Sequence, residues 1–179
     1  MRKLEETVLS SEPVYLGKLI DLYTEQVELP DGGTSMREIV RHPGAVAMVP
    51  LTANDEVILV RQYRLAARRI LLEIPAGTLD PDEDPLTAAA RELQEEIGCR
   101  PGKLEPLGGE FTAPGYTTEY IHLYLATDLE ASTLAMDDDE FLEIVRLPLA
   151  EALRQVEAGE IVDGKTIIGL LLTARRLGR

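Results

Sequence analysis

Three glutamates within five residues are the side chains whose spacing best suits them for chemistry. Glu92 and Glu96 are four residues apart, and Glu95 lies between them, so on a helix the three carboxylates are neighbours. Like charges at this spacing repel each other, and a bound cation removes that repulsion. Carboxylate oxygens are the ligands preferred by hard divalent ions such as Mg²⁺ and Mn²⁺. The spacing is compatible with a metal site, although three glutamates alone are more typical of a solvated helix face.

Residues 85–97 are predicted to form the helix that carries these carboxylates. Asp84 can cap its N-terminus, and Pro85 suits the first helical position, where a missing N–H costs nothing. Gly98 can adopt the left-handed conformation that ends many helices. The apolar face is expected to contain Leu86, Ala90, Leu93 and Ile97. Arg91, one turn before Glu95, can orient that carboxylate.

Composition limits the range of partners. The chain has 179 residues, 45% of them hydrophobic, and a net charge of −14. This length fits one domain, or one domain with a small extension. The negative charge disfavours nucleic acid and anionic membranes as partners, whereas bound metal ions would still allow a small anionic substrate. With Cys99 as the only cysteine, no internal disulfide can form. We find no signal peptide and no apolar run of about 18 residues, and expect a soluble cytoplasmic protein.

Residues 1–43 are predicted to form an N-terminal antiparallel β extension. Residues 12–29 alternate partly between apolar and polar side chains and are rich in β-formers. A Pro-Asp-Gly-Gly turn at 30–33 precedes a returning strand at 35–41. Strands this few and short have no core of their own. They are therefore expected to pack on residues 44–179, which form the main domain, or on a second copy of the chain.

The main domain shows an alternation of strands and helices. Strands are predicted at 45–51, 57–63, 70–75, 104–112, 120–126 and 142–147. The strand at 57–63 is expected to be the hairpin partner of the strand at 45–51. Helices are predicted at 148–158 and 164–177. This order favours an α/β fold with a mixed sheet between helices.

A stretch of 23 residues resembles the signature of the Nudix family. Its fixed positions are Gly77, Glu83, Arg91, Glu92, Leu93, Glu95, Glu96, Gly98 and the apolar Cys99. The resemblance implies a Nudix-type α/β/α sandwich and Mg²⁺- or Mn²⁺-dependent hydrolysis of a diphosphate linked to another group. It further implies two or three ions, held by Glu92, Glu95, Glu96 and the main-chain carbonyl of Ala76. Glu83 lies before the helix and is expected to support the loop there.

Other segments resemble the ADP-ribose pyrophosphatases of this family. They are Val60-Arg-Gln-Tyr-Arg64, Leu72-Glu-Ile-Pro-Ala-Gly77, the loop around Pro114 and the acidic segment 138–143. The resemblance implies hydrolysis of ADP-ribose to AMP and ribose 5-phosphate. In that reaction Glu95 and Glu96 would be catalytic as metal ligands. Glu140 is expected to be the general base or a further metal ligand, with Asp138 as the second candidate.

The same resemblance implies the substrate contacts and the oligomeric state. The expected substrate-binding residues are Arg37, Glu38, Arg64, Thr78, Pro114 and Glu119. The two arginines would contact the diphosphate or the terminal ribose, because a guanidinium fork matches phosphate oxygens. In this subgroup the N-terminal strands swap between two subunits, so we expect a homodimer. Ala113 stands where relatives often have serine, and the aliphatic pair at 19–20 replaces an aromatic residue that stacks on adenine.

Two other functions stay open. One is a hydrolase of another nucleotide sugar, such as GDP-mannose, since several such compounds share the diphosphate core. The other is a Nudix-like sensor that binds ADP-ribose without turnover. The intact Glu92, Glu95 and Glu96 disfavour a sensor, because binding alone does not need three crowded carboxylates.

Overall fold

The computed structural model describes residues 4–132 and 141–179 of the chain. Its residues form two compact units. The N-terminal unit contains residues 1–44 and 111–120, and the main unit contains residues 45–110 and 121–179. Each unit is described separately.

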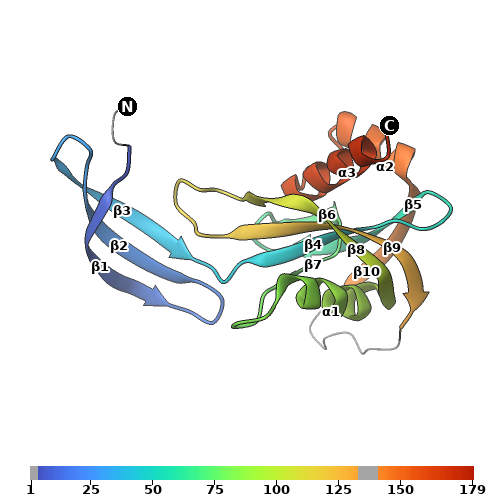
Figure 1. The fold of residues 1–179 in the computed structure, drawn as a ribbon, viewed down its shortest axis with the longest axis horizontal. Helices are drawn as coiled ribbons and strands as arrows, with labels where there is room; N and C mark the ends of the chain where they lie inside the picture. Colours follow the sequence, from blue (N-terminus) through green and yellow to red (C-terminus); the bar gives the residue numbers. More distant parts are fainter. Residues whose placement is uncertain (1–3, 133–140) are drawn as a thin grey trace. The chain divides into compact units, whose positions relative to one another are not determined.

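The N-terminal unit is an antiparallel sheet with almost no core. Its strands are β1 (Thr7–Leu16), β2 (Asp21–Glu28) and β3 (Thr34–Arg41), in the order β1-β2-β3 (Figure 1). The loop 112–119 joins the end of β3, where Val40 donates its N–H to the Tyr116 carbonyl oxygen at 2.7 Å. Among the described residues of this unit, Val27 is the one buried hydrophobic side chain, and β1 is exposed along its whole length.

Two sheets form the centre of the main unit. The first has the order β7-β4-β9-β8 and contains β4 (Ala45–Pro50), β7 (Ala76–Thr78), β8 (Cys99–Phe111) and β9 (Tyr120–Ala131). Strand β4 is parallel to β9 and antiparallel to β7, so this sheet is mixed. The second sheet, β10-β5-β6, is antiparallel and contains β5 (Glu56–Arg64), β6 (Arg69–Glu73) and β10 (Leu142–Pro148).

The predicted hairpin of residues 45–51 and 57–63 is wrong. Strands β4 and β5 belong to different sheets, and an isolated bridge between Leu51 and Val57 is the pairing that joins their ends. The physical reason is that both edges of β4 are already occupied by β7 and β9. At the short turn between β4 and β5 the chain therefore passes from the four-stranded sheet to the three-stranded one and does not close a hairpin.

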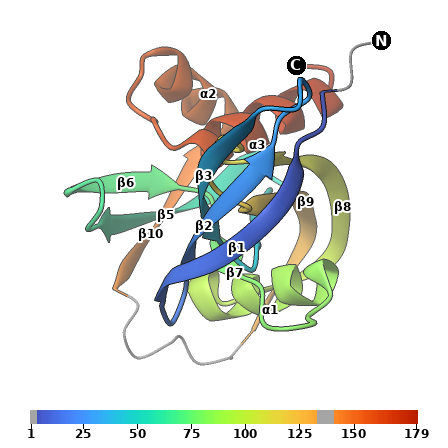
Figure 2. The same cartoon turned by 90° about the vertical axis from the view of Figure 1, so that its left-hand side faces the viewer.

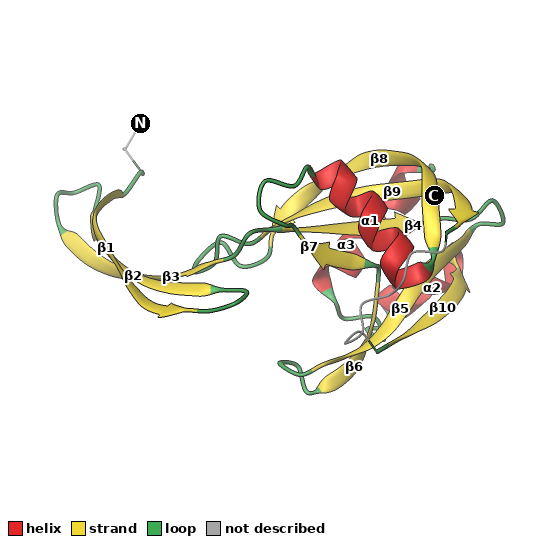
Figure 3. Ribbon diagram, turned by 90° about the horizontal axis from the view of Figure 1, so that it is seen from below, coloured by secondary structure: helices red, strands yellow, loops and turns green. Residues whose placement is uncertain are grey.

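Three helices cover the two faces of the four-stranded sheet. Helix α1 (Pro85–Ile97) lies on one side, and α2 (Leu149–Glu157) and α3 (Gly164–Arg176) lie on the other (Figures 1 and 2). Seen from below, α1 crosses in front of the strands (Figure 3). The sheet is therefore the middle layer of an α/β/α sandwich, as predicted. No helix in residues 4–132 and 141–179 is long and apolar enough to span a membrane.

Alternation along β4 explains the three layers. Ala47 and Val49 belong to a buried cluster with side chains of α2 and α3, such as Leu149 and Leu170. Met48, between them in sequence, faces the other way into a second cluster. Successive strand residues point to opposite faces, so an uninterrupted apolar strand is buried on both sides.

Helix α1 begins and ends where the sequence predicts. The Asp84 carboxylate accepts a hydrogen bond from the Thr87 N–H at 3.1 Å, and Gly98 has φ 62°. The buried face is partly different from the predicted one, because Ala88 and Ala89 are fully buried. Leu86 is 44% exposed. Small alanines let a helix approach a sheet closely. The prediction chose the buried face of α1 by its large apolar residues and therefore placed that face part of a turn away from the observed one.

Candidate active site

Arg91 lies at the centre of the acidic face of α1. Its Nη1 donates to Glu92 Oε1 at 2.7 Å and to Glu95 Oε2 at 2.8 Å, so the predicted pairing with Glu95 is confirmed. Its Nε and Nη2 donate to both carboxylate oxygens of Glu83, at 3.0 and 2.9 Å. These contacts, first of all the hydrogen bonds to Glu83, raise the pKa of Arg91. One guanidinium thereby offsets the repulsion among three carboxylates.

Glu83 also supports the loop before α1, as predicted. Its Oε2 accepts a hydrogen bond from the Asp80 N–H at 3.1 Å. The hydrogen bonds from Arg91 hold the pKa of the Glu83 carboxyl below its ordinary value. The loop and the helix are therefore connected through one ionised side chain.

Two of the predicted metal ligands are buried against the backbone of β7. Glu92 is 9% exposed and Glu96 is 3% exposed. The N–H of Ala76 donates to Glu96 Oε2 at 3.1 Å. A Cβ added at Gly77 would lie 1.9 Å from the Glu92 carboxyl carbon, closer than any real contact. The glycine is therefore required for Glu92 to lie where it does.

The donor atoms suit a hard divalent ion in their chemistry. The structure brings Ala76, Glu92 and Glu96 together at the contact of β7 with α1, and Arg91 links Glu95 to Glu92. All four residues offer oxygen ligands. In the described ranges, however, no three His, Cys, Asp or Glu side chains are arranged as a metal site. Glu140 and Asp138, predicted as base or ligand, lie outside the described residues. The metal and catalytic roles of these residues stay predictions.

A second ionic cluster surrounds Glu73, at the end of β6. Arg64 donates Nε and Nη2 to the two carboxylate oxygens of Glu73, each at 2.8 Å. Lys165 at the start of α3 also donates to Glu73 and lies 3.0 Å from Asp163 Oδ1. Burial alone would raise the pKa of Glu73, but the hydrogen bond from Arg64 and the charge of Lys165 hold it below its ordinary value.

Sequence reasoning missed Glu73, Asp163 and Lys165. Glu73 and Lys165 are 92 residues apart, and no local pattern connects them. The available signal was a glutamate inside an otherwise apolar strand, since a buried charge needs a partner. Arg64 was predicted to bind substrate, and the structure directs two of its donors to Glu73 instead of leaving the side chain fully free.

The other predicted substrate-binding residues fall in both units. Thr78 is half-buried on β7 of the main unit, where it pairs with Ala45. Arg37, Glu38, Pro114 and Glu119 lie in the N-terminal unit. Arg37 pairs with Glu6, Glu119 accepts from Thr112 Oγ1 at 2.8 Å, and Glu38 and Pro114 are exposed. Their contacts with substrate stay predictions.

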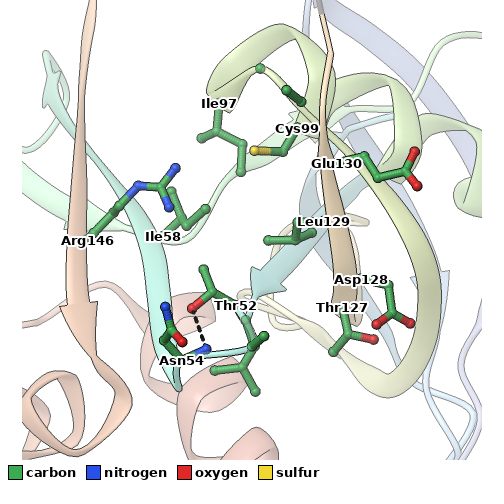
Figure 4. Close-up of a pocket in the computed structure, with 14 residues that line it drawn as sticks. Thr52, Asn54, Ile58, Ile97, Cys99, Thr127, Asp128, Leu129, Glu130 and Arg146 are labelled. Atoms are coloured by element: carbon green, nitrogen blue, oxygen red, sulfur yellow. Dashed lines mark hydrogen bonds between the residues drawn. The ribbon is translucent and has the colours of Figure 1, made fainter.

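A cavity of about 770 Å³ lies in the main unit, at the C-terminal end of α1 (Figure 4). Ile58, Ile97 and Leu129 line its apolar part, and the Arg146 side chain points toward Ile97. None of the predicted site residues lines this cavity. The candidate site is therefore the contact of β7 with α1 and not this hollow.

Comparison with known proteins gives matches over most of the chain. A family model described as NUDIX domain matches residues 41–167. A second, described as nucleoside diphosphate sugar hydrolase N-terminal domain, matches residues 6–40.

Individual relatives cover nearly the same length. The chain is 44% identical to an ADP-ribose pyrophosphatase of Bacillus subtilis over 93% of the chain and 91% of the relative. It is 42% identical to a methanol dehydrogenase activator of Bacillus methanolicus, with the same two shares. A crystal structure of an ADP compounds hydrolase superposes with a TM-score of 0.87 at 28% identity, covering 99% of this chain and 97% of that one.

Replacing Gly77 tests the packing of β7 against the acidic face. Gly77→Ala puts a methyl group into the Glu92 carboxylate, which must then move. We expect Mn²⁺ binding, measured by calorimetry, to weaken by about 10–100-fold, the usual effect of disturbing the groups that orient metal ligands. Gly115→Ala is the control, because nothing lies within 4 Å of a Cβ there. Equal Mn²⁺ affinity in both variants would refute the predicted metal site.

Glu73→Gln tests the buried ionic cluster. Its loss leaves Arg64 and Lys165 without their shared anion, so the free energy of unfolding should fall by about 3–5 kcal/mol at pH 7. The folded pKa of Glu73 is lowered. Its stabilisation is therefore complete above the unfolded pKa of about 4.3 and is lost as the pH falls through the folded value.

Urea unfolding at neutral and acid pH measures both effects. The difference between Glu73→Gln and the unaltered chain should shrink below about pH 4. Glu143→Gln, which removes an exposed partner of Arg61, is the control and should change stability by about 0–1 kcal/mol. A Glu73→Gln difference that stays constant with pH would contradict the ionised state assigned to Glu73.

Proposed function

The chain belongs to the NUDIX domain family, and from this premise we propose that it hydrolyses the diphosphate bond of ADP-ribose. The products are AMP and ribose 5-phosphate. The observation that carries the proposal is the packing of Gly77 and Ala76 against the buried carboxylates of Glu92 and Glu96. The choice of ADP-ribose is supported by the pyrophosphatase of Bacillus subtilis and by the solved ADP compounds hydrolase.

Members of this family generally need divalent metal ions. We propose Glu92, Glu95, Glu96 and the Ala76 carbonyl oxygen as ligands of two or three Mg²⁺ or Mn²⁺ ions, with Glu140 as a further ligand. When bound, such ions neutralise the charge of the diphosphate and lower the pKa of a bound water. The chain's own part is to hold the ligands in place. Arg91 fixes Glu92 and Glu95 relative to each other, and the Ala76 N–H fixes Glu96.

The general base is proposed to be Glu140, on the resemblance alone. Asp138 is the second candidate, and its shorter side chain reaches less far. Both lie outside the described residues. The catalytic set proposed is thus Glu95, Glu96 and Glu140.

The substrate contacts are proposed on the same basis. Arg64 offers an exposed guanidinium in the main unit, and Thr78 lies beside Gly77 on β7. The remaining proposed contacts are Arg37, Glu38, Pro114 and Glu119. Arginine suits the diphosphate because its planar fork donates two parallel hydrogen bonds to phosphate oxygens.

The first experiment is turnover of a nucleotide sugar panel in the presence of Mg²⁺, Mn²⁺ or EDTA. ADP-ribose should be hydrolysed with either metal and not with EDTA, and GDP-mannose more slowly. Preference for another sugar would keep the chemistry and reject ADP-ribose. Binding of ADP-ribose without turnover in either metal would favour a sensor.

Glu96→Gln tests the metal role directly. It removes the charge of one proposed ligand and keeps the size of the side chain, so kcat should fall by about 10²–10³-fold, the effect of losing a few kcal/mol of electrostatic stabilisation. The melting temperature should remain close to that of the unaltered chain. Glu157→Gln, at an exposed position on α2, is the matched control. Unchanged turnover by Glu96→Gln would rule out the assignment.

We also propose that the chain is a homodimer in which residues 1–43 pack on a second copy of the chain. The support is the exposure of apolar side chains on β1, where Val8, Val14, Tyr15 and Leu16 are each more than half exposed. Several large apolar side chains exposed on one strand are typical of an interface.

Light scattering at micromolar concentration measures the assembly. The unaltered chain should have twice the mass of one copy, and Val14→Glu with Leu16→Glu should shift it to a single copy by placing charges on the exposed face. Glu12→Gln, on the same strand, should leave the mass unchanged. A monomeric unaltered chain would refute the dimer.

A further inference from the structure

The ionic cluster around Glu73 has no part in the reaction as described above, although it reaches toward the candidate site. Glu73 is 0% exposed and receives Arg64 from β5 and Lys165 from α3. A buried carboxylate is tolerated only where cations and hydrogen bonds replace its hydration. The paired strands β5 and β6 and the sequence-distant helix α3 therefore meet at one anion.

Lys165 adds a second cation to this cluster, and Asp163 adds a second carboxylate. Arg64 and Glu73 alone would form a neutral pair, whereas Lys165 adds a second cation to the same carboxylate. The Lys165 side chain is 11% exposed, so its charge acts mainly on its neighbours. Asp163, which also holds Lys165, caps α3 and accepts from the Thr166 N–H at 3.0 Å. The positive end of the helix dipole offsets part of the Asp163 charge.

Arg64 connects the cluster to the acidic face of α1. Its pKa is raised, first of all by the hydrogen bond to Glu73. Glu73 lies three residues before Ala76 in the sequence, and the Ala76 N–H donates to Glu96 Oε2 at 3.1 Å, so the cluster and the acidic face meet on one short segment. The side chain is 41% exposed. Of the five N–H donors of a guanidinium, two are directed to Glu73. Within residues 4–132 and 141–179 the other three donors make no hydrogen bond and are available for an anion.

We propose that Lys165 is a positioning residue for the hydrolysis. By sharing the Glu73 carboxylate, it holds the Arg64 fork in one orientation and preserves the positive field of Arg64 toward the substrate diphosphate. An arginine already fixed by two hydrogen bonds loses less side-chain entropy on binding than a free one. The inference rests on the proposed function, because it requires a diphosphate beside the acidic face of α1.

The competing explanation is that these contacts only attach α3 to β6. In that case the loss of Lys165 lowers stability and leaves substrate binding unchanged. The two explanations differ in KM and in their dependence on Arg64. They do not differ in melting temperature, which therefore serves only to show that a variant is folded.

A double-mutant cycle separates them. Lys165→Met should raise the KM for ADP-ribose, and its Kd measured by calorimetry in EDTA, by about tenfold, while kcat changes by less than about threefold. Lys165→Arg should restore most of the affinity, because it keeps the cation. In an Arg64→Gln background, Lys165→Met should raise KM by less than about twofold, since residues that act through each other are not additive.

Matched variants keep the test decisive. Lys103→Met removes an exposed lysine paired with Glu105 and should change neither constant. If Lys165→Met does not fold, Asp163→Asn carries the same test, because it keeps an oxygen to cap α3 and removes the charge that holds Lys165.

Each outcome decides the inference. The inference is overturned if folded Lys165→Met, or Asp163→Asn in its place, has an unchanged KM. It is also overturned if Lys165→Met raises KM equally in the unaltered chain and in Arg64→Gln. These results would leave the proposed function intact. An unaltered chain that neither binds nor hydrolyses ADP-ribose overturns the proposed function and this inference with it.

Discussion

The candidate site depends on holding several carboxylates together in a place that water barely reaches. Glu92 and Glu96 are nearly buried, and their repulsion would favour unfolding of the turn that carries them. Arg91, on the same helix, reduces this repulsion by donating hydrogen bonds to Glu92, Glu95 and Glu83. The backbone of β7 stabilises the same carboxylates from the opposite side. The Ala76 N–H donates to Glu96, and Gly77 leaves space for Glu92.

The chain solves a similar problem differently at Glu73. There one cation comes from the neighbouring strand β5 and the other from α3, far away in the sequence, and the carboxylate is wholly buried. The two clusters are connected by the segment 73–76. Its backbone groups at residues 74, 75 and 76 form hydrogen bonds with α3, β4 and α1 in turn. Thr166 Oγ1 accepts from the Ile74 N–H at 2.9 Å, and the Pro75 carbonyl oxygen accepts from the Met48 N–H at 2.9 Å. The strand that faces α1 is thus fixed on both sides.

Local chemistry was predictable from the sequence, and long-range pairing was not. The ends of α1 follow from Asp84, Pro85 and Gly98, because capping depends on neighbours within one turn. The three-layer sandwich follows from apolar strands between amphipathic helices. The partner of β4 was predicted wrongly, since a short turn does not fix which edge of a sheet is free. The same limit hid the Glu73 to Lys165 contact, which depends on how the whole main unit folds.

Lys165 and Thr166 lie far beyond the acidic helix in the sequence, and this sets the order in which their contacts can form during synthesis. The acidic helix emerges from the ribosome long before α3, so its carboxylates are present while the segment 73–76 still lacks its contact with Thr166. Glu73 also lacks its second cation until then. A ribosome-bound chain that stops before residue 164 therefore contains the whole 23-residue signature together with Arg91 and the Ala76 N–H, but lacks the two α3 side chains that bind residues 73 and 74. The contacts of Lys165 and Thr166 with residues 73 and 74 can thus form only after α3 has been synthesised.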